Sequence, residues 1–506
     1  MSRTEEATKN YIIITISEIV VLLMGFWCRA LFVQKIGNYF LGINGILTSV
    51  FQILALSNLG LGDAIAYSLI QAYARKNENK IIGIYNYSKK IYKGIIAILI
   101  VFSIMIAFVL PFLVNGVVDF TKFYVYYAIF IASKIVTYCA GPYSTVLRAD
   151  QKIRIMKKGE LLGYVITTLL QIIFMYIYPS YAVYLFLAFL ASVISNMYVR
   201  YEFRKNYNWI LKQKYDIEIE DKKIIIKRMK DVFISRLSSA AVESTDNILI
   251  SKFIGLELVG IYSNYNMIIS NIRSLAKNLY SSMESSLGNI NALSSKEEIK
   301  QLYHKILLGF QIIAVIFVTC IFVLIQEFIS IWIGDNYLLS TSVLIVLAVD
   351  LYINIILYAQ TCFINTTDLF AEVKTVYFWG AVINVVLSII LGWKMGLLGI
   401  LLGTILSRAL CNFPVGLFLL CKKQMDVNWV KELGLCIFYM MQMLFVVCVT
   451  YLIFKRFYVT NIFLWIVKGG LVFAVAAGCI LIMNFKNSNI NFYKDKISYM
   501  IKRIKG

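Results

Sequence analysis

The sequence predicts an all-α, polytopic integral membrane protein with about 14 transmembrane helices, built as two pseudosymmetric six-helix bundles plus two C-terminal helices. Three observations predict this fold class. The 506 residues are 60% hydrophobic and only 15% charged, and soluble domains of this length do not have such a composition. Apolar runs of about 20 residues, enough to cross a hydrocarbon core of about 30 Å, recur along the chain. A long internal repeat relates the two halves.

The internal repeat is clearest at two glycine turns. Isoleucine and glycine recur at a constant offset of 218 residues, as Ile36-Gly37 and Gly42-Ile43, then as Ile254-Gly255 and Gly260-Ile261. At the same offset Glu18 aligns with Arg236, and the spacing between Glu18 and Arg29 puts both on one helix face. Because a polar stripe facing lipid is unfavourable, we expect it to face a bundle interior or a water-filled cavity. Internal repeats of this kind are typical of transporters.

Fourteen apolar segments are expected to span the membrane. They are 11–33, 43–70, 94–117, 122–146, 159–178, 180–199, 231–253, 260–285, 305–326, 340–364, 375–393, 396–421, 432–454 and 461–485. Segments 43–70 and 260–285 are the least apolar, so we expect them to line a cavity or pack against the other half. Pro142 and Pro414 fall inside spans and should bend their helices locally.

The repeat divides the chain into three predicted parts. Residues 1–215 form an N-terminal six-helix bundle with the start of a cytoplasmic linker, 216–425 a C-terminal six-helix bundle, and 426–506 two further helices with a basic tail. Lysine and arginine concentrate in alternate loops and in the tail, whereas the loop predicted at 327–339 holds Glu327 and Asp335 and no basic residue. The positive-inside rule therefore predicts cytoplasmic N and C termini, and it accounts for the net charge of +21 without nucleic-acid binding.

Several classes of function are disfavoured by what the sequence lacks. None of the nine cysteines forms a CxxC pair, and His304 is the only histidine, so we expect no metal site and no nucleophile–histidine relay. The sequence holds no Walker motif, so we expect no ATP hydrolysis and no cofactor. The predicted protein is not an enzyme.

Ionisable residues inside the predicted spans are the candidate functional residues, because such groups are expensive in lipid. A cavity lined by the basic ones suits a polyanion such as phosphate or pyrophosphate: Arg29, Lys134, Arg236, Arg273 and Arg408. The acidic ones are candidates for ion coupling or for ion pairs with these bases: Glu18, Asp63, Glu243, Asp246 and Asp350. Arg29 and Arg236 have an alternative role as snorkelling residues near span ends.

Four stretches resemble the polysaccharide-transport branch of the MOP/MATE-like superfamily, the Wzx-type polysaccharide biosynthesis flippases. They are 40–69, 244–268, 328–340 and 384–407, in an order that covers nearly the whole chain. The resemblance implies two six-helix bundles around a central cavity. It also implies movement of undecaprenyl-pyrophosphate-linked oligosaccharides across the bacterial cytoplasmic membrane for capsule or O-antigen-like polymers. Cationic cavity residues would hold the pyrophosphate, and Arg29, Lys134, Arg236, Arg273 and Arg408 fit that role by location.

Two alternatives stay open beside a flippase that works by alternating access. A MATE-type cation-coupled multidrug exporter would need a net acidic cavity, whereas this one is predicted to be basic. A polysaccharide polymerase would need a sizeable outer loop, and no predicted outer loop is long enough. Under the flippase hypothesis, the expected partners are a lipid-linked oligosaccharide substrate and the membrane. A polymerase and glycosyltransferases of the same pathway are further possible partners.

Overall fold

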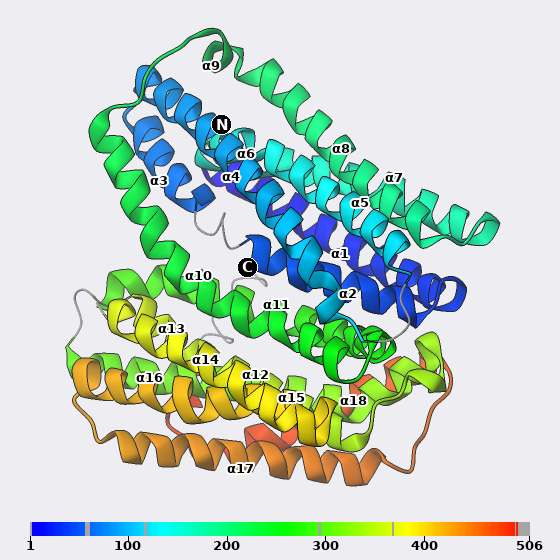
Figure 1. Ribbon diagram of the computed structural model, residues 1–506. Coiled ribbons are helices and arrows are strands. Elements are labelled where there is room, and N and C mark those ends of the chain that lie inside the picture. The colour runs from blue at the N-terminus through cyan, green and yellow to red at the C-terminus, as the bar shows by residue number, and fades with distance from the viewer. Residues whose placement is uncertain are drawn as a thin grey trace. The chain divides into compact units, whose positions relative to one another are not determined.

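The computed structural model describes residues 3–55, 61–115, 119–291, 295–366, 369–490 and 492–493. Every regular element within these ranges is a helix, as Figure 1 shows. The contacts among residues divide the chain into two compact units, Met1–Gly260 and Ile261–Gly506. The all-α prediction is confirmed, and the division into 1–215, 216–425 and 426–506 stays a prediction.

The helices follow the predicted spans along the whole described chain. Those starting in the first unit are α1 (Arg3–Lys35), α2 (Asn38–Leu54), α3 (Leu61–Ala74), α4 (Glu78–Leu113), α5 (Phe120–Cys139), α6 (Gly141–Ala149), α7 (Ile153–Ile177), α8 (Tyr181–Asn206), α9 (Asn208–Lys212), α10 (Ile219–Phe253) and α11 (Leu256–Asn291). The others are α12 (Lys296–Ile333), η2 (Asp335–Tyr337), α13 (Thr341–Asn365), α14 (Phe370–Met395), α15 (Leu397–Ser407), η3 (Arg408–Asn412), α16 (Phe413–Leu420), η4 (Cys421–Met425), α17 (Trp429–Phe454) and α18 (Ile462–Met483).

Their lengths confirm a multi-pass membrane protein. Among the described residues, 10 helices are long and apolar enough to cross a membrane, or up to 11 if the bent pair α5 and α6 counts as one span. That pair bends by 41°, and Pro142 lies in the first turn of α6, as predicted. The predicted span 43–70 is instead two helices, α2 and α3, with 56–60 outside the described residues. Pro414 is the second residue of α16, which directly follows the π-helical turn η3.

In the first unit, α7 packs against α8, α1 against α7 and α5 against α8, and Figure 1 shows α7 and α8 side by side. Aromatic side chains also connect α1 with α8: the rings of Phe32 and Tyr184 lie 4.7 Å apart and nearly edge to face. The later helix α10 packs against α2 and α3, far back in the chain. Helices that are far apart in the sequence therefore pack together in this unit.

The two predicted glycine turns occur in matching form. Gly37 has a φ of 99° and Gly255 a φ of 133°, a region that favours glycine. A Cβ on Gly42 would lie 1.9 Å from the carbonyl oxygen of Leu256, and one on Gly260 would lie 2.3 Å from that of Asn38. Leu256 and Asn38 are themselves one repeat apart in the sequence. The contact is thus reciprocal, as across a two-fold axis, which supports the predicted pseudosymmetry.

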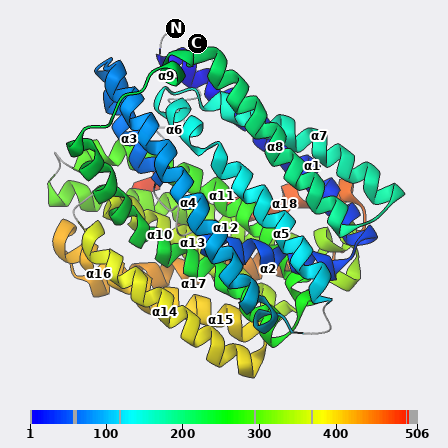
Figure 2. The ribbon, with the colours of Figure 1, turned by 45° about the horizontal axis from the view of Figure 1, so that its top comes forward.

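In the second unit, α14 and α15 pack along each other and are visible side by side in Figure 2. Two glycines one turn apart on α15 permit this approach: a Cβ on Gly399 would lie 2.0 Å from the carbonyl oxygen of Leu391, and one on Gly403 would lie 2.5 Å from the backbone nitrogen of Ser388. Small residues at this spacing let backbones meet closely within membranes. Asn384 adds a side-chain hydrogen bond to Thr404 at 2.9 Å.

Replacing Gly403 by alanine is expected to lower the midpoint of thermal unfolding by several degrees, because a backbone atom must move to admit the methyl group. Overpacking of this kind costs about 1–3 kcal/mol. Gly434→Ala is the matched control, since a Cβ there would meet nothing within 4 Å. The measurement is thermal unfolding of the purified protein in one detergent. Equal midpoints for the two variants would contradict the close packing of α14 on α15.

The C-terminal hairpin of α17 and α18 is fixed to α12 by polar contacts. Lys468 Nζ lies 2.6 Å from Glu327 Oε1 and donates a hydrogen bond to the carbonyl oxygen of Phe457 at 2.6 Å. Near the other end of α12, His304 Nε2 is 2.9 Å from Glu432 Oε2. The prediction that places Glu327 in a loop is wrong: α12 continues to Ile333 with Glu327 buried. Pairing with Lys468 makes a carboxylate tolerable inside the helix bundle.

Candidate functional site

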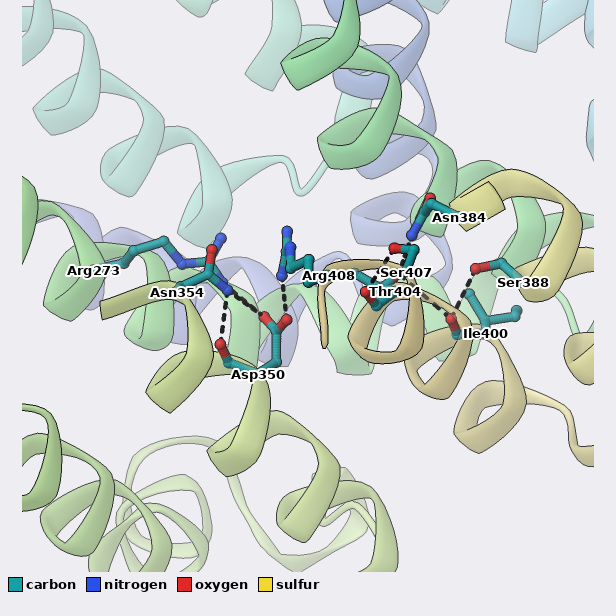
Figure 3. Close-up of polar contacts among 9 residues, drawn as sticks. All are labelled: Arg273, Asp350, Asn354, Asn384, Ser388, Ile400, Thr404, Ser407 and Arg408. Atoms are coloured by element: carbon teal, nitrogen blue, oxygen red, sulfur yellow. Dashed lines mark hydrogen bonds and ion pairs between the residues drawn. The ribbon is translucent and has the colours of Figure 1, made fainter. Parts of the chain in front are cut away.

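Four polar side chains of the second unit meet in what we call the Asp350 cluster: Arg273 of α11, Asp350 and Asn354 of α13, and Arg408 of η3. Figure 3 shows Asp350 between Arg273 and Arg408. Asp350 is the tenth of the 25 residues of α13, so it lies near the middle of a helix long enough to cross a membrane. Transporter binding sites are commonly found at this depth.

The geometry of the Asp350 cluster holds the carboxylate from three directions. Arg273 Nη2 lies 3.3 Å from Asp350 Oδ2, and Arg408 Nη1 pairs with Asp350 Oδ1. Asn354 donates from Nδ2 to Asp350 Oδ2 at 3.0 Å and to the Asp350 carbonyl at 2.7 Å. The exposed fractions are 22% for the Arg273 side chain, 15% for Asp350 and 11% for Arg408. The cluster is therefore largely buried but still accessible.

The cluster carries two cations and one anion, so its net charge is +1. Asp350 lowers the cost of keeping the two guanidinium groups away from water. Arg273 Nε is buried and has no hydrogen-bond partner among the described residues. A planar guanidinium with unused donors is suited to phosphate or carboxylate oxygens. The arrangement can therefore attract and orient an anion within the membrane.

The position of Arg408 depends on the helical pair described above. Arg408 is the first residue of η3, a π-helical turn that directly follows α15. Such turns are rare and are often found at functional sites. In the helices before it, Ser407 Oγ donates to the Thr404 carbonyl at 2.9 Å, and Ser388 Oγ donates to the Ile400 carbonyl at 3.0 Å (Figure 3). The packing of α15 on α14 thus sets where Arg408 meets Asp350.

In the first unit, Lys134 of α5 lies among aromatic rings. Its Nζ is 4.9 Å from the ring centroid of Phe130 and 5.4 Å from that of Phe51. No carboxylate of the described residues lies within ion-pair distance of Lys134. Aromatic faces partly compensate for the lost hydration of an ammonium group, but they leave its charge in place. Arg29 of α1 interacts electrostatically with Tyr184 of α8.

The structure thus brings together three of the predicted site residues, Arg273, Arg408 and Asp350. Glu18 is exposed on α1 and Asp246 half-buried on α10. The side chains of Asp63, Arg236 and Glu243 lie outside the described residues. Their predicted roles in binding or coupling stay predictions. Sequence reasoning missed Asn354, for which its position one helical turn after Asp350 is the available signal, and it gave no sign of the π-helical turn.

Comparison with known proteins identifies the family. A family of proteins described as polysaccharide biosynthesis proteins matches residues 7–282. A search of curated proteins gives no match. Among solved structures, the lipid II flippase MurJ in an inward closed conformation is 14% identical with a TM-score of 0.68, covering 94% of this chain and 99% of that one.

Two further structures belong to the MOP superfamily by their descriptions. A multidrug resistance MATE family transporter in an inward-facing conformation is 15% identical with a TM-score of 0.66, covering 80% of this chain and 97% of the other. A transporter from Pyrococcus furiosus, described by the reverse polarity of its binding pocket, is 13% identical with a TM-score of 0.54, covering 81% and 94%. These likenesses establish the fold. The chain therefore belongs to the polysaccharide biosynthesis protein family and has the fold of MOP-superfamily transporters.

Proposed function

We propose that this protein is a flippase that moves undecaprenyl-pyrophosphate-linked oligosaccharides from the inner to the outer leaflet of the bacterial cytoplasmic membrane. Both termini would lie in the cytoplasm, where the basic loops are expected. The observation that carries the proposal is the net positive Asp350 cluster at the middle depth of the second unit. The polysaccharide biosynthesis family and a fold shared with the flippase MurJ support it.

The hardest step for such a substrate is moving a diphosphate through the apolar core, where an unpaired charge is most unfavourable. A fixed cluster with a net charge of +1 offsets part of this cost at the depth where it is greatest. Asp350 keeps the guanidinium groups of Arg273 and Arg408 oriented in the absence of substrate. The Asp350 cluster would not need specific contacts with the oligosaccharide or the lipid tail, because every undecaprenyl-pyrophosphate-linked substrate carries the same diphosphate.

The charge of the Asp350 cluster also disfavours export of cationic drugs, since a net positive site repels them. Lys134, with aromatic neighbours and no acidic partner among the described side chains, adds a second cation on the first unit. Both observations favour an anionic substrate. Glycosyltransferases would supply the lipid-linked oligosaccharide and a polymerase would consume it outside, with alternating access as the transport mechanism.

Deleting the gene is expected to abolish the surface polymer and to cause complete, unpolymerised repeat units linked to undecaprenyl pyrophosphate to accumulate in the inner leaflet. The measurement is mass spectrometry of extracted lipids, combined with labelling by a membrane-impermeant, sugar-binding reagent before and after lysis. Accumulation on the outer leaflet would instead indicate a polymerase defect. Normal lipid-linked intermediates would refute a flippase and indicate export of another compound.

A further inference from the structure

A basic pocket lies on the first unit, remote in sequence from the Asp350 cluster. It is a cavity of about 390 Å³ between the start of α4 and the segment 213–218, which joins α9 to α10. We call it the lysine pocket, and its lining residues are Asn86, Lys89, Lys90, Lys93, Lys214, Tyr215 and Asp216. Figure 1 shows the segment passing close to the start of α4. The volume is in the range of sites for small ligands.

The segment that closes the lysine pocket is held against α4 by two direct contacts and by an ion pair from the first turn of α10, which follows it. Lys80 Nζ lies 2.9 Å from Asp221 Oδ1, and the Asp221 side chain is only 7% exposed. Asn86 Nδ2 donates to the carbonyl oxygen of Tyr215 at 3.4 Å. A Cβ on Gly83 would lie 3.1 Å from the carbonyl oxygen of Asp216, so the two backbones are in close contact. Lys214 therefore faces α4 in a defined position.

The lysine pocket concentrates unbalanced positive charge. Four lysines and one aspartate line it, which leaves a net charge of +3. None of the four lysines has a carboxylate within ion-pair distance in the part of the chain that the structure describes. Lys89 Nζ lies 5.0 Å from the ring centroid of Tyr85, which fixes one of the four cations. Like charges held together repel each other, and a bound polyanion relieves that repulsion.

The sequence of α4 fixes the depth of the lysine pocket. α4 has 36 residues, so it is about 54 Å long and extends beyond a hydrocarbon core of about 30 Å. Lys93 is the last charged residue before an uncharged run that continues to Leu113. The four pocket lysines therefore lie at the boundary between lipid and water, at the depth of phosphate headgroups.

We propose that the lysine pocket binds a diphosphate group at the membrane surface. Resting on the proposed function, this group is the headgroup of the lipid-linked oligosaccharide, held on the cytoplasmic side before transport. A surplus of +3 spread over two sides of one cavity matches two adjacent phosphates better than a single phosphodiester. Scattered lysines that only set membrane orientation need neither a fixed closing segment nor a shared cavity.

The test measures binding to the full-length protein in nanodiscs of phosphatidylcholine. The probes are inorganic pyrophosphate, undecaprenyl pyrophosphate and phosphatidylglycerol. The pocket variant carries Lys89→Gln, Lys93→Gln and Lys214→Gln. The matched control removes the same charge from exposed lysines of the first unit outside the pocket, with Lys76→Gln, Lys158→Gln and Lys205→Gln.

Undecaprenyl pyrophosphate and inorganic pyrophosphate are expected to bind about tenfold or more weakly to the pocket variant, because each lost charge-assisted hydrogen bond alone is worth about this factor. The control variant should bind as the unaltered protein does. Equal losses in both variants, or stronger binding of phosphatidylglycerol than of undecaprenyl pyrophosphate, would overturn the proposal. Binding is measured without transport, so a deletion strain with normal lipid intermediates would refute the flippase while leaving pyrophosphate binding to be judged separately.

Discussion

Replacing Arg408 by glutamine is expected to abolish surface polymer while the protein remains in the membrane at normal abundance. The variant keeps one cation, Arg273, and one anion, Asp350, so the buried charges stay balanced. What it loses is the surplus positive charge that we assign to the diphosphate. The measurements are surface polymer and lipid-linked intermediates in a complemented deletion strain, with immunoblotting of membranes for abundance.

The control for this prediction is Lys423→Gln. Lys423 lies in η4, after Arg408 in the sequence, and forms an exposed ion pair with Glu372 of α14, so the change removes a cation outside the cluster. It should leave export unchanged. Asp350→Asn tests the cluster by removing its anion instead of one of its cations. It should lower abundance strongly, because it removes the buried carboxylate that Arg273 and Arg408 both contact. Combining Asp350→Asn with Arg408→Gln should restore much of the abundance but no export. Normal export by Arg408→Gln would refute a role for the cluster in substrate transport.

Breaking the buried pair between Lys468 and Glu327 is expected to be the most destabilising single change described. Their side chains are only 6% and 9% exposed, so either partner alone would be an uncompensated buried charge. Removing one partner of such a pair costs about 3–5 kcal/mol. Lys468→Met and Glu327→Gln should each lower the unfolding midpoint sharply, as followed by thermal unfolding of the purified protein.

A double variant distinguishes the cost of an uncompensated buried charge from the cost of lost packing. Lys468→Met combined with Glu327→Leu replaces the pair by apolar side chains and should regain most of the lost stability, since apolar replacements of buried pairs are often neutral or stabilising. Lys300→Gln is the control on the same helix, because Lys300 and Glu297 form an exposed pair whose loss should cost under about 1 kcal/mol. Additive losses in the double variant would show that the two residues do not act as a pair.

The spans were predictable because they are apolar runs bounded by charge, and each overlaps one or two helices of the described chain. Their ends were less predictable. The span predicted at 94–117 overlaps only the later, apolar part of α4, which runs from Glu78 to Leu113, because a helix continues into water wherever its residues still favour it. The position of Glu327 was predicted wrongly for a related reason. Its charge indicated the end of the span, but the residues after it are mostly apolar and α12 continues to Ile333.

The candidate site was predictable in its residues and not in its contacts. Arg273, Asp350 and Arg408 each stand out as a charge within an apolar segment. Their meeting depends on how α11, α13 and η3 cross, and the pairs are 77 and 58 residues apart in the chain. Hydrophobic periodicity reports which face of a helix is polar, but it does not report which other helix that face contacts.

The packing of α10 against α2 and α3 has a consequence for biosynthesis. These early helices end at Ala74, and the helix that covers them begins only at Ile219. A chain that enters the membrane in order of synthesis must therefore hold α2 without its main packing partner, and α3 without one of its partners, while much of the unit is still being translated. The reciprocal contact between Gly42 and Leu256 forms later still. For this chain, the period of greatest exposure to quality-control proteases should end when α10 inserts.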